Sequence, residues 1–254
     1  MLATHDRATL LTYAALLLAT AAAWVSMVWT PTGAEDMAGM EMAMTPTVSE
    51  AVAFVAAWAV MMAAMMLPSA APMIGLYAVT RQDAARPTAK VVAVALFALT
   101  YLALWAVTGL PIYFASLALM ALAPVTLAYA IAGVLVVAGI FQLSPLKHVC
   151  LRQCRSPLGF LLGHWRAGWR GGVAMGWAHA VYCLGCCWAL MVVLVVAGAM
   201  GLPWVLLIAC VVAAEKLLPR GDWIARMTGV VLALLGVAVA IHPGLATVLR
   251  ASSM

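Results

Sequence analysis

The chain has 254 residues, of which 67% are hydrophobic and only 8% are charged. Soluble globular domains carry charged residues at about three times that frequency. The composition therefore excludes a water-soluble globular protein, and the formal net charge of +5 has to be interpreted in a membrane setting.

Five stretches of the chain contain no Asp, Glu, Lys or Arg, and about 20 apolar residues are enough to cross a bilayer as a helix. Each of the two longest stretches is interrupted by Gly and Pro residues, including Gly109 and Pro111 in the first, so each is expected to hold two spans. We predict an all-α polytopic membrane bundle, a single domain over residues 1–254. Its seven transmembrane helices are predicted at 8–29, 51–78, 91–110, 124–143, 172–198, 203–218 and 227–243.

The positions of the basic residues predict the orientation. Lys and Arg in short loops stay on the cytoplasmic side, and an inside N-terminus places all of the 13 Lys and Arg inside except Arg250. We therefore predict a multi-pass protein of the bacterial inner (plasma) membrane, with the N-terminus inside and the C-terminus outside. This asymmetry also explains the net positive charge without a nucleic-acid partner.

The first loop, residues 30–50, is predicted to lie outside and is both acidic and rich in methionine. Thioethers are soft ligands that suit Cu(I). Transient copper binding and the absence of any metal role remain open for this loop. Its methionines are Met37, Met40, Met42 and Met44.

The second predicted helix carries paired methionines just before Pro68. Met61 and Met65 share one helix face, and Met62 and Met66 share another. Their thioethers are candidate Cu(I) ligands, whereas the alternative is that they fill gaps in a hydrophobic core.

The loop at 144–171 is predicted to lie inside, and it places Cys150 and Cys154 among basic residues. If the segment is helical, both sulfurs share one face. Neighbouring Lys and Arg are expected to lower the pKa values of these thiols and to favour the metal-binding thiolate. The alternative is two ordinary cytoplasmic thiols.

The strongest local feature is the run from His179 to Trp188 in the fifth predicted helix, with Cys183, Cys186 and Cys187. Helical spacing allows the imidazole and two or three of the sulfurs to face one point. A membrane histidine usually marks a site, although a single such cysteine is often only a small buried hydrophobe. At 1.5 Å per residue, these cysteines and the methionines of the second helix are expected near the same depth.

The sixth predicted helix ends with Glu215 and Lys216 side by side. An acidic residue at the edge of a membrane helix is either part of an interfacial charge pair or a proton or metal ligand. We expect Glu215 and Lys216 to form an interfacial pair.

Several of these residues together resemble a bacterial family of predicted metal-binding integral membrane proteins of unassigned function. The resemblance rests on the segments 142–147 and 150–157 and on the Cys-Leu-Gly-Cys-Cys-Trp motif at 183–188, with further similarity at 64–68 and at Glu215 and Lys216. It covers residues 51–240. It implies an integral membrane protein with a metal site, whereas the choice of copper follows from the softness of the ligands.

The leading functional hypothesis is a membrane protein that binds or handles Cu(I) between the second and fifth predicted helices, with zinc as the alternative metal. An enzyme, a copper-dependent membrane oxidoreductase acting on a hydrophobic substrate or quinol, is the alternative, and no catalytic residue is identified. The third hypothesis is a thiol relay or a metal-free partner subunit. The expected partners are the lipid bilayer and a protein that exchanges metal or electrons with the chain. The candidate metal ligands are Met61, Met62, Met65, Met66, Cys150, Cys154, His179, Cys183, Cys186 and Cys187.

Overall fold

A computed structural model describes residues 7–29, 47–81, 87–196 and 201–251, and these ranges form helices joined by short connections. The methionines of the loop at 30–50 lie outside the described residues. The helices are α1 (Arg7–Trp29), α3 (Val48–Thr80), α4 (Pro87–Met120), α5 (Pro124–Leu143), α6 (Pro145–Arg155), α7 (Pro157–His164), α8 (Gly168–Val196), α9 (Leu202–Leu217), α10 (Gly221–Ile241) and α11 (Gly244–Ala251).

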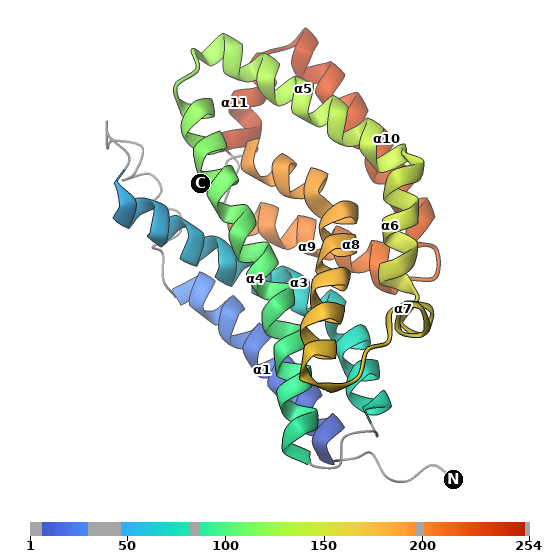
Figure 1. Ribbon diagram of the computed structural model, residues 1–254. Helices are drawn as coiled ribbons and strands as arrows, with labels where there is room; N and C mark the ends of the chain where they lie inside the picture. The colour runs from blue at the N-terminus through green and yellow to red at the C-terminus, as the bar shows by residue number, and fades with distance from the viewer. Residues whose placement is uncertain (1–6, 30–46, 82–86, 197–200, 252–254) are drawn as a thin grey trace.

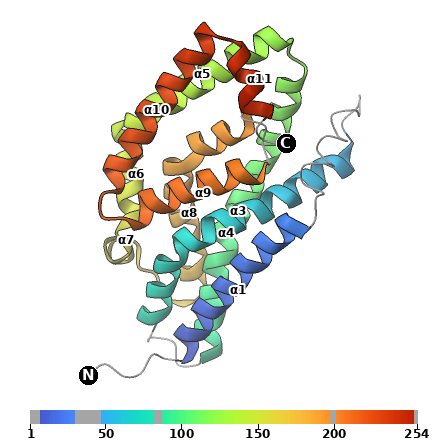
Figure 2. The ribbon, with the colours of Figure 1, turned by 180° about the vertical axis from the view of Figure 1, so that it is seen from behind.

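The bundle has two outer groups of helices with α8 and α9 between them (Figures 1 and 2). One outer group consists of α1, α3 and α4, and the other consists of α5 and α10, which pack along each other. α8 lies along α4 and also contacts α5, while α9 contacts α3 and α10. The short helix α6 lies against α8 and α9. Residues from α3, α4, α5, α6 and α10 therefore meet around α8 and α9.

Local sequence signals account for where several helices begin. Thr47 caps α3 in a capping box, because its side chain accepts a hydrogen bond from the Glu50 backbone N–H while the Glu50 carboxylate accepts one from the Thr47 N–H. Proline occupies the first turn of α5, α6 and α7, where the missing N–H has no helical partner to lose. Ser144 caps α6 by accepting a hydrogen bond from the Lys147 N–H at 3.2 Å.

The prediction of a polytopic helical membrane bundle is confirmed. Six of the described helices are long and apolar enough to cross a membrane: Leu10–Trp29, Val48–Thr80, Thr88–Met120, Pro124–Leu143, Gly168–Val196 and Gly221–Ile241. α9, the remaining predicted span, has 16 residues and therefore extends about 24 Å, less than the hydrocarbon core of about 30 Å. Seven spans were predicted, and six helices reach the required length.

Two predicted boundaries are wrong. The third helix was expected to end near Gly109 and Pro111, yet α4 continues through both to Met120. Proline is tolerated inside membrane helices, and Gly109 leaves space for Trp58, whose Cδ1 would lie 2.9 Å from an added Cβ. The segment 144–171 was expected to be a loop, whereas most of it forms α6 and α7.

Proline inside α3 is accommodated by a donor from another helix. Pro68 has no N–H, so the Ala64 carbonyl four residues earlier lacks its usual partner within the helix. The indole Nε1 of Trp24 in α1 donates to this carbonyl at 3.1 Å. α1 therefore supplies the hydrogen bond that α3 cannot make for itself.

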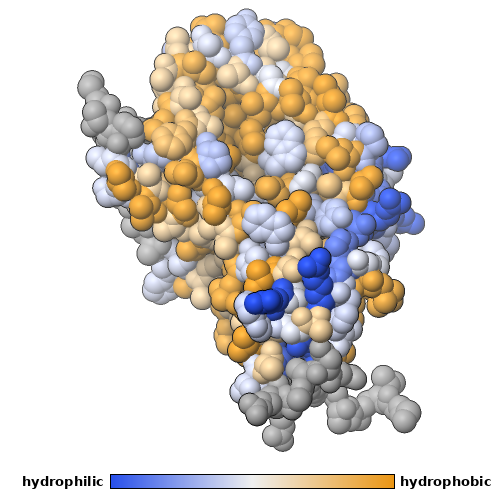
Figure 3. All heavy atoms as spheres, viewed as in Figure 1, coloured by the Kyte–Doolittle hydropathy of each residue, from blue (hydrophilic) through white to orange (hydrophobic). Residues whose placement is uncertain are grey.

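The surface is apolar over most of the face shown in Figure 3, and hydrophilic residues gather toward α6, α7 and the start of α8. The arginines of this region are Arg152, Arg155, Arg166 and Arg170. Such a division between an apolar body and a polar end is typical of a membrane protein. The predicted N-inside orientation would place this end in the cytoplasm.

Candidate metal site

Four thiols lie together in the interior where α6 meets α8, and we call Cys154, Cys183, Cys186 and Cys187 the sulfur cluster. All four are at most 7% exposed, and all are free thiols. The Sγ atom of Cys154 lies 3.8 Å from that of Cys186, which lies 3.4 Å from that of Cys187. The Cys186 thiol also donates to the Cys183 carbonyl at 3.2 Å. The cluster thus joins the two cysteine motifs, which are separated by 32 residues in sequence at their closest pair.

Gly185, within the cysteine motif of α8, allows α6 to approach. A Cβ atom at this position would lie only 2.7 Å from Cys150 Sγ, much closer than nonbonded carbon and sulfur atoms pack. Cys150 is therefore directed at α8, like Cys154 one helical turn later. The cysteine spacing alone gives no role to Gly185, although small residues in membrane helices often allow such a close approach.

Lys216 extends from the last turn of α9 into the space beside the sulfur cluster. Its ammonium group donates to Cys183 Sγ at 3.1 Å, to Ser69 Oγ at 3.2 Å and to Met66 Sδ at 3.9 Å. An ammonium group has three donors, and these three acceptors use them all. The hydroxyl of Tyr101 lies 3.0 Å from the same Cys183 sulfur. Cys183 therefore lies between a buried cation and a phenol.

Glu215, the residue before Lys216, belongs to a separate group with Lys147 and Gln142, which we call the ion-pair cluster. All three side chains are at most 1% exposed. Lys147 Nζ lies 2.6 Å from Glu215 Oε2, and Gln142 Nε2 donates to Glu215 Oε1 at 3.0 Å. Lys147 also donates to the Gln142 amide oxygen. The predicted interfacial pair of Glu215 and Lys216 is therefore wrong, because both are buried and each has other partners.

The four methionines that precede Pro68 in α3 are all buried, at 2% exposed or less. Met66 approaches the site through its contact with Lys216, so Met66 and Cys183 meet at the same ammonium group. Met61, Met62 and Met65 are members of the hydrophobic core. The prediction that sulfur atoms from the second and fifth spans lie near each other is thus met by Met66 and Cys183, with Lys216 between them.

His179 is buried among aromatic rings. Its imidazole is stacked on Tyr101, with ring centroids 5.5 Å apart, and packs against Phe97 and Phe160. Its Nδ1 atom has no hydrogen-bond partner among the described residues. Tyr101 therefore contacts both residues, because its ring stacks on His179 and its hydroxyl lies beside Cys183 Sγ.

The basic residues of α6 do not activate its thiols. Burial raises the pKa of the Cys150 thiol. The pKa of Cys154 lies well above its usual value because of interaction with the Cys183 sulfur and burial. The expectation that nearby Lys and Arg lower both pKa values is wrong, because Cys150 and Cys154 face α8, whereas Arg152 between them is exposed.

In the part of the chain that the structure describes, no three His, Cys, Asp or Glu side chains are already arranged to hold a metal ion. Metal binding by the sulfur cluster thus requires side-chain rotation.

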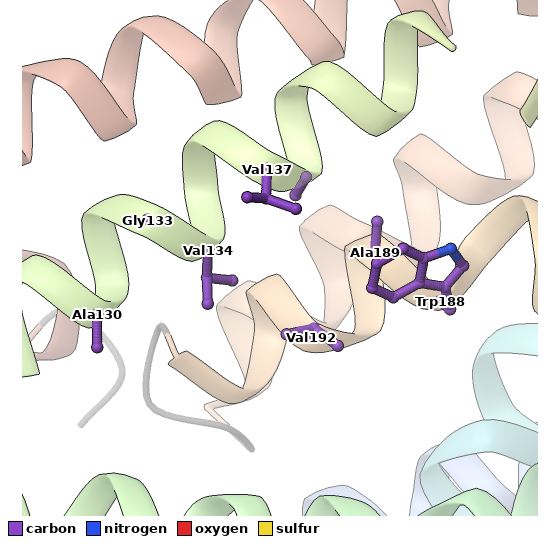
Figure 4. Close-up of a pocket in the computed structure, with 8 residues that line it drawn as sticks. Ala130, Gly133, Val134, Val137, Trp188, Ala189 and Val192 are labelled. Carbon is purple, nitrogen blue, oxygen red and sulfur yellow. The ribbon is translucent and has the colours of Figure 1, made fainter. Parts of the chain in front are cut away.

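An apolar cavity of about 360 Å³ lies between α5 and α8 (Figure 4). Trp188, the last residue of the Cys-Leu-Gly-Cys-Cys-Trp motif, and Ala189 form part of its lining from α8, and Val134 and Val137 form part of it from α5. The lining includes no sulfur, imidazole or carboxylate group. The cavity therefore offers none of the metal-binding groups that the sulfur cluster contains.

The fold and the buried thiols define a polytopic membrane protein with a sulfur-rich interior. The chain belongs to the PpoB2 family, described as copper chaperones, whose sequence pattern matches residues 55–239. The match includes α6, α8 and α9 and hence the whole sulfur cluster and Lys216. Comparison with curated proteins and with solved structures finds no match. The chain is thus a copper-related membrane protein.

Proposed function

We propose that the chain is a membrane copper chaperone that carries Cu(I) on the sulfur cluster. The cluster supplies two thiolate ligands from among Cys154, Cys183, Cys186 and Cys187, and Met66 is a neutral thioether ligand at the edge of the site. The observation that carries the proposal is the contact of thiols from α6 and α8 inside a membrane bundle, with Cys154 and Cys186 at 3.8 Å. Family membership independently supports copper as the cargo.

The donor set fits Cu(I) because thiolates and thioethers are soft ligands that select this ion over Mg, Ca or Mn. The spacing also fits a shared metal ion. With metal–sulfur bonds of about 2.3 Å, as in zinc thiolate sites, two sulfurs at a tetrahedral angle lie about 3.8 Å apart. Cys154 and Cys186 already have this separation, so two sulfurs of the cluster are spaced to share one ion.

The remaining candidate residues are assigned to other steps. Cys150 is partly exposed and lies one turn from Cys154, so we assign it to transfer between the cluster and a protein partner that delivers or receives copper. We place His179 and Met61, Met62 and Met65 outside the primary ligand set, because their described contacts are with aromatic rings and the hydrophobic core. With the predicted orientation, transfer occurs at the cytoplasmic face of the inner membrane.

The test is elemental analysis of the detergent-purified full chain after loading with Cu(I) under reducing conditions. The variant Cys183→Ser/Cys186→Ser/Cys187→Ser is compared with Cys210→Ser, whose thiol is exposed on α9. We expect near-stoichiometric copper in the wild type and in Cys210→Ser and its loss from the triple variant. Full copper content in a folded triple variant would contradict the proposal.

A further inference from the structure

The position of Lys216 carries an inference that rests on the proposed function. Lys216 is buried, at 7% exposed, and its ammonium group contacts Cys183, Ser69 and Met66. Ser69 and Met66 are neutral, so Cys183 is the member of this set that becomes an anion when it binds a metal. Glu215 is already paired with Lys147 and Gln142.

We infer that Lys216 is the counter-cation of the copper site and makes the site selective for Cu(I) over divalent metal ions. A buried charge without a partner is costly in an apolar interior, so the total charge of the site matters. Two thiolates and one Cu(I) form a complex with one negative charge. Lys216 balances that charge, and the site is neutral.

A divalent ion changes this balance. Two thiolates and one Zn(II) are neutral together, so Lys216 would remain as an uncompensated positive charge. Neutrality with a divalent ion requires a third thiolate, that is, the deprotonation of one more buried thiol. The other groups near Lys216 do not supply a fixed negative charge, because they are Tyr101 of α4 and the thiols Cys186 and Cys187 of α8. Lys216 therefore favours the monovalent ion.

Replacing Lys216 tests this inference through a ratio of two affinities. Lys216→Leu removes the charge without adding a sulfur ligand for Cu(I), and Lys216→Arg keeps the charge. The full chain in detergent is titrated anaerobically with Cu(I) against a chromophoric Cu(I) chelator, and separately with Zn(II) against a zinc indicator. We expect Lys216→Leu to weaken Cu(I) binding by about tenfold or more without weakening Zn(II) binding, whereas Lys216→Arg keeps the wild-type ratio.

A matched control removes buried charge elsewhere. The double variant Lys147→Met/Glu215→Gln deletes the ion-pair cluster without changing the net charge, so the ratio of Cu(I) to Zn(II) affinity should stay at the wild-type value. If Lys216→Leu does not fold, Lys216→Gln replaces it in the comparison with Lys216→Arg. Equal factors of change for both metals, or an unchanged Cu(I) affinity, would overturn the inference while leaving the proposed function intact. A wild-type protein that binds no Cu(I) would overturn the proposed function and this inference with it.

Discussion

Two buried lysines of this bundle are stabilised in different ways. Lys147 of α6 meets a carboxylate and an amide in the ion-pair cluster, whereas Lys216 of α9 meets a thiol, a hydroxyl and a thioether. The first arrangement is complete without any further component. The second provides positive charge next to ligands that become negative when they bind a metal. Glu215 thus belongs to a charge cluster with a structural role. Lys216, the next residue in the sequence, belongs to a group of side chains that is suited to a cargo ion.

The largest effect is expected from breaking the ion-pair cluster. Glu215→Ala leaves Lys147 buried without its anion, and removal of one partner of a buried pair costs about 3–5 kcal/mol. The free energy of unfolding in mixed micelles, measured by denaturant titration, should fall by this amount. Asp222→Ala removes an exposed partner of Arg155 and should cost at most about 1 kcal/mol. Equal losses in both variants would contradict the structural role of the ion-pair cluster.

An intermediate effect is expected where α6 approaches the sulfur cluster. Gly185→Ala introduces a Cβ 2.7 Å from Cys150 Sγ, and such overpacking costs about 1–3 kcal/mol. The same substitution should reduce copper content, because it pushes Cys154 away from Cys186. Both properties are measured on one preparation, by denaturant titration and by elemental analysis.

Two variants check the cause of this loss. Cys150→Ala removes the clashing sulfur, so adding it to Gly185→Ala should restore most of the stability. Gly133→Ala in α5 is the matched control, because a Cβ there meets no atom within 4 Å. A Gly185→Ala protein as stable as Gly133→Ala would refute the close approach of α6 to α8.

A smaller effect is expected at the hydroxyl that Lys216 contacts. Ser69→Ala removes one of three acceptors from the ammonium group, and a lost hydrogen bond of this kind costs about 1 kcal/mol or slightly more. Ser116→Ala is the control, because both serines are 7% exposed and donate to a carbonyl three residues earlier in the same helix. Denaturant titration should show a greater loss for Ser69→Ala. A greater loss of stability for Ser116→Ala would contradict the hydrogen bond between Lys216 and Ser69.

The smallest effect concerns the reactivity of Cys150. Burial raises its pKa, and the thiolate is the form that reacts with alkylating reagents, so its thiolate fraction at a given pH is lower than in an ordinary thiol. The midpoint of the pH–rate profile for alkylation should therefore lie above that of N-acetylcysteine. Site-resolved mass spectrometry of the wild type measures this profile. A midpoint below that of N-acetylcysteine would instead support the expectation that neighbouring Lys and Arg lower the pKa of Cys150.

The sequence was sufficient to predict the membrane bundle, and it pointed to the cysteines as candidate ligands, although it placed Cys154 in a loop apart from Cys183, Cys186 and Cys187. Long apolar stretches and cysteine spacing within one helix are local properties. The contact of Cys154 with Cys186 is not local, because it depends on α6 folding back against α8, and no periodicity specifies which helix a short segment will contact.

The error at Glu215 and Lys216 has a different origin, because the relevant physical rule was available. Adjacent residues on a helix point about 100° apart and do not face each other. A pair between them was therefore disfavoured from the start. Their true partners, Lys147 and Cys183, lie 68 and 33 residues away in the chain and required the structure.

The hydrogen bond from Trp24 to the Ala64 carbonyl has an evolutionary consequence. Pro68 leaves that carbonyl without its helical donor, and Trp24 supplies a replacement from another helix. A relative with an ordinary residue at 68 regains the backbone donor and is free to vary at 24, whereas a relative that keeps the proline needs a side-chain donor there. Positions 24 and 68 are therefore expected to covary among homologous sequences, although 43 other residues lie between them.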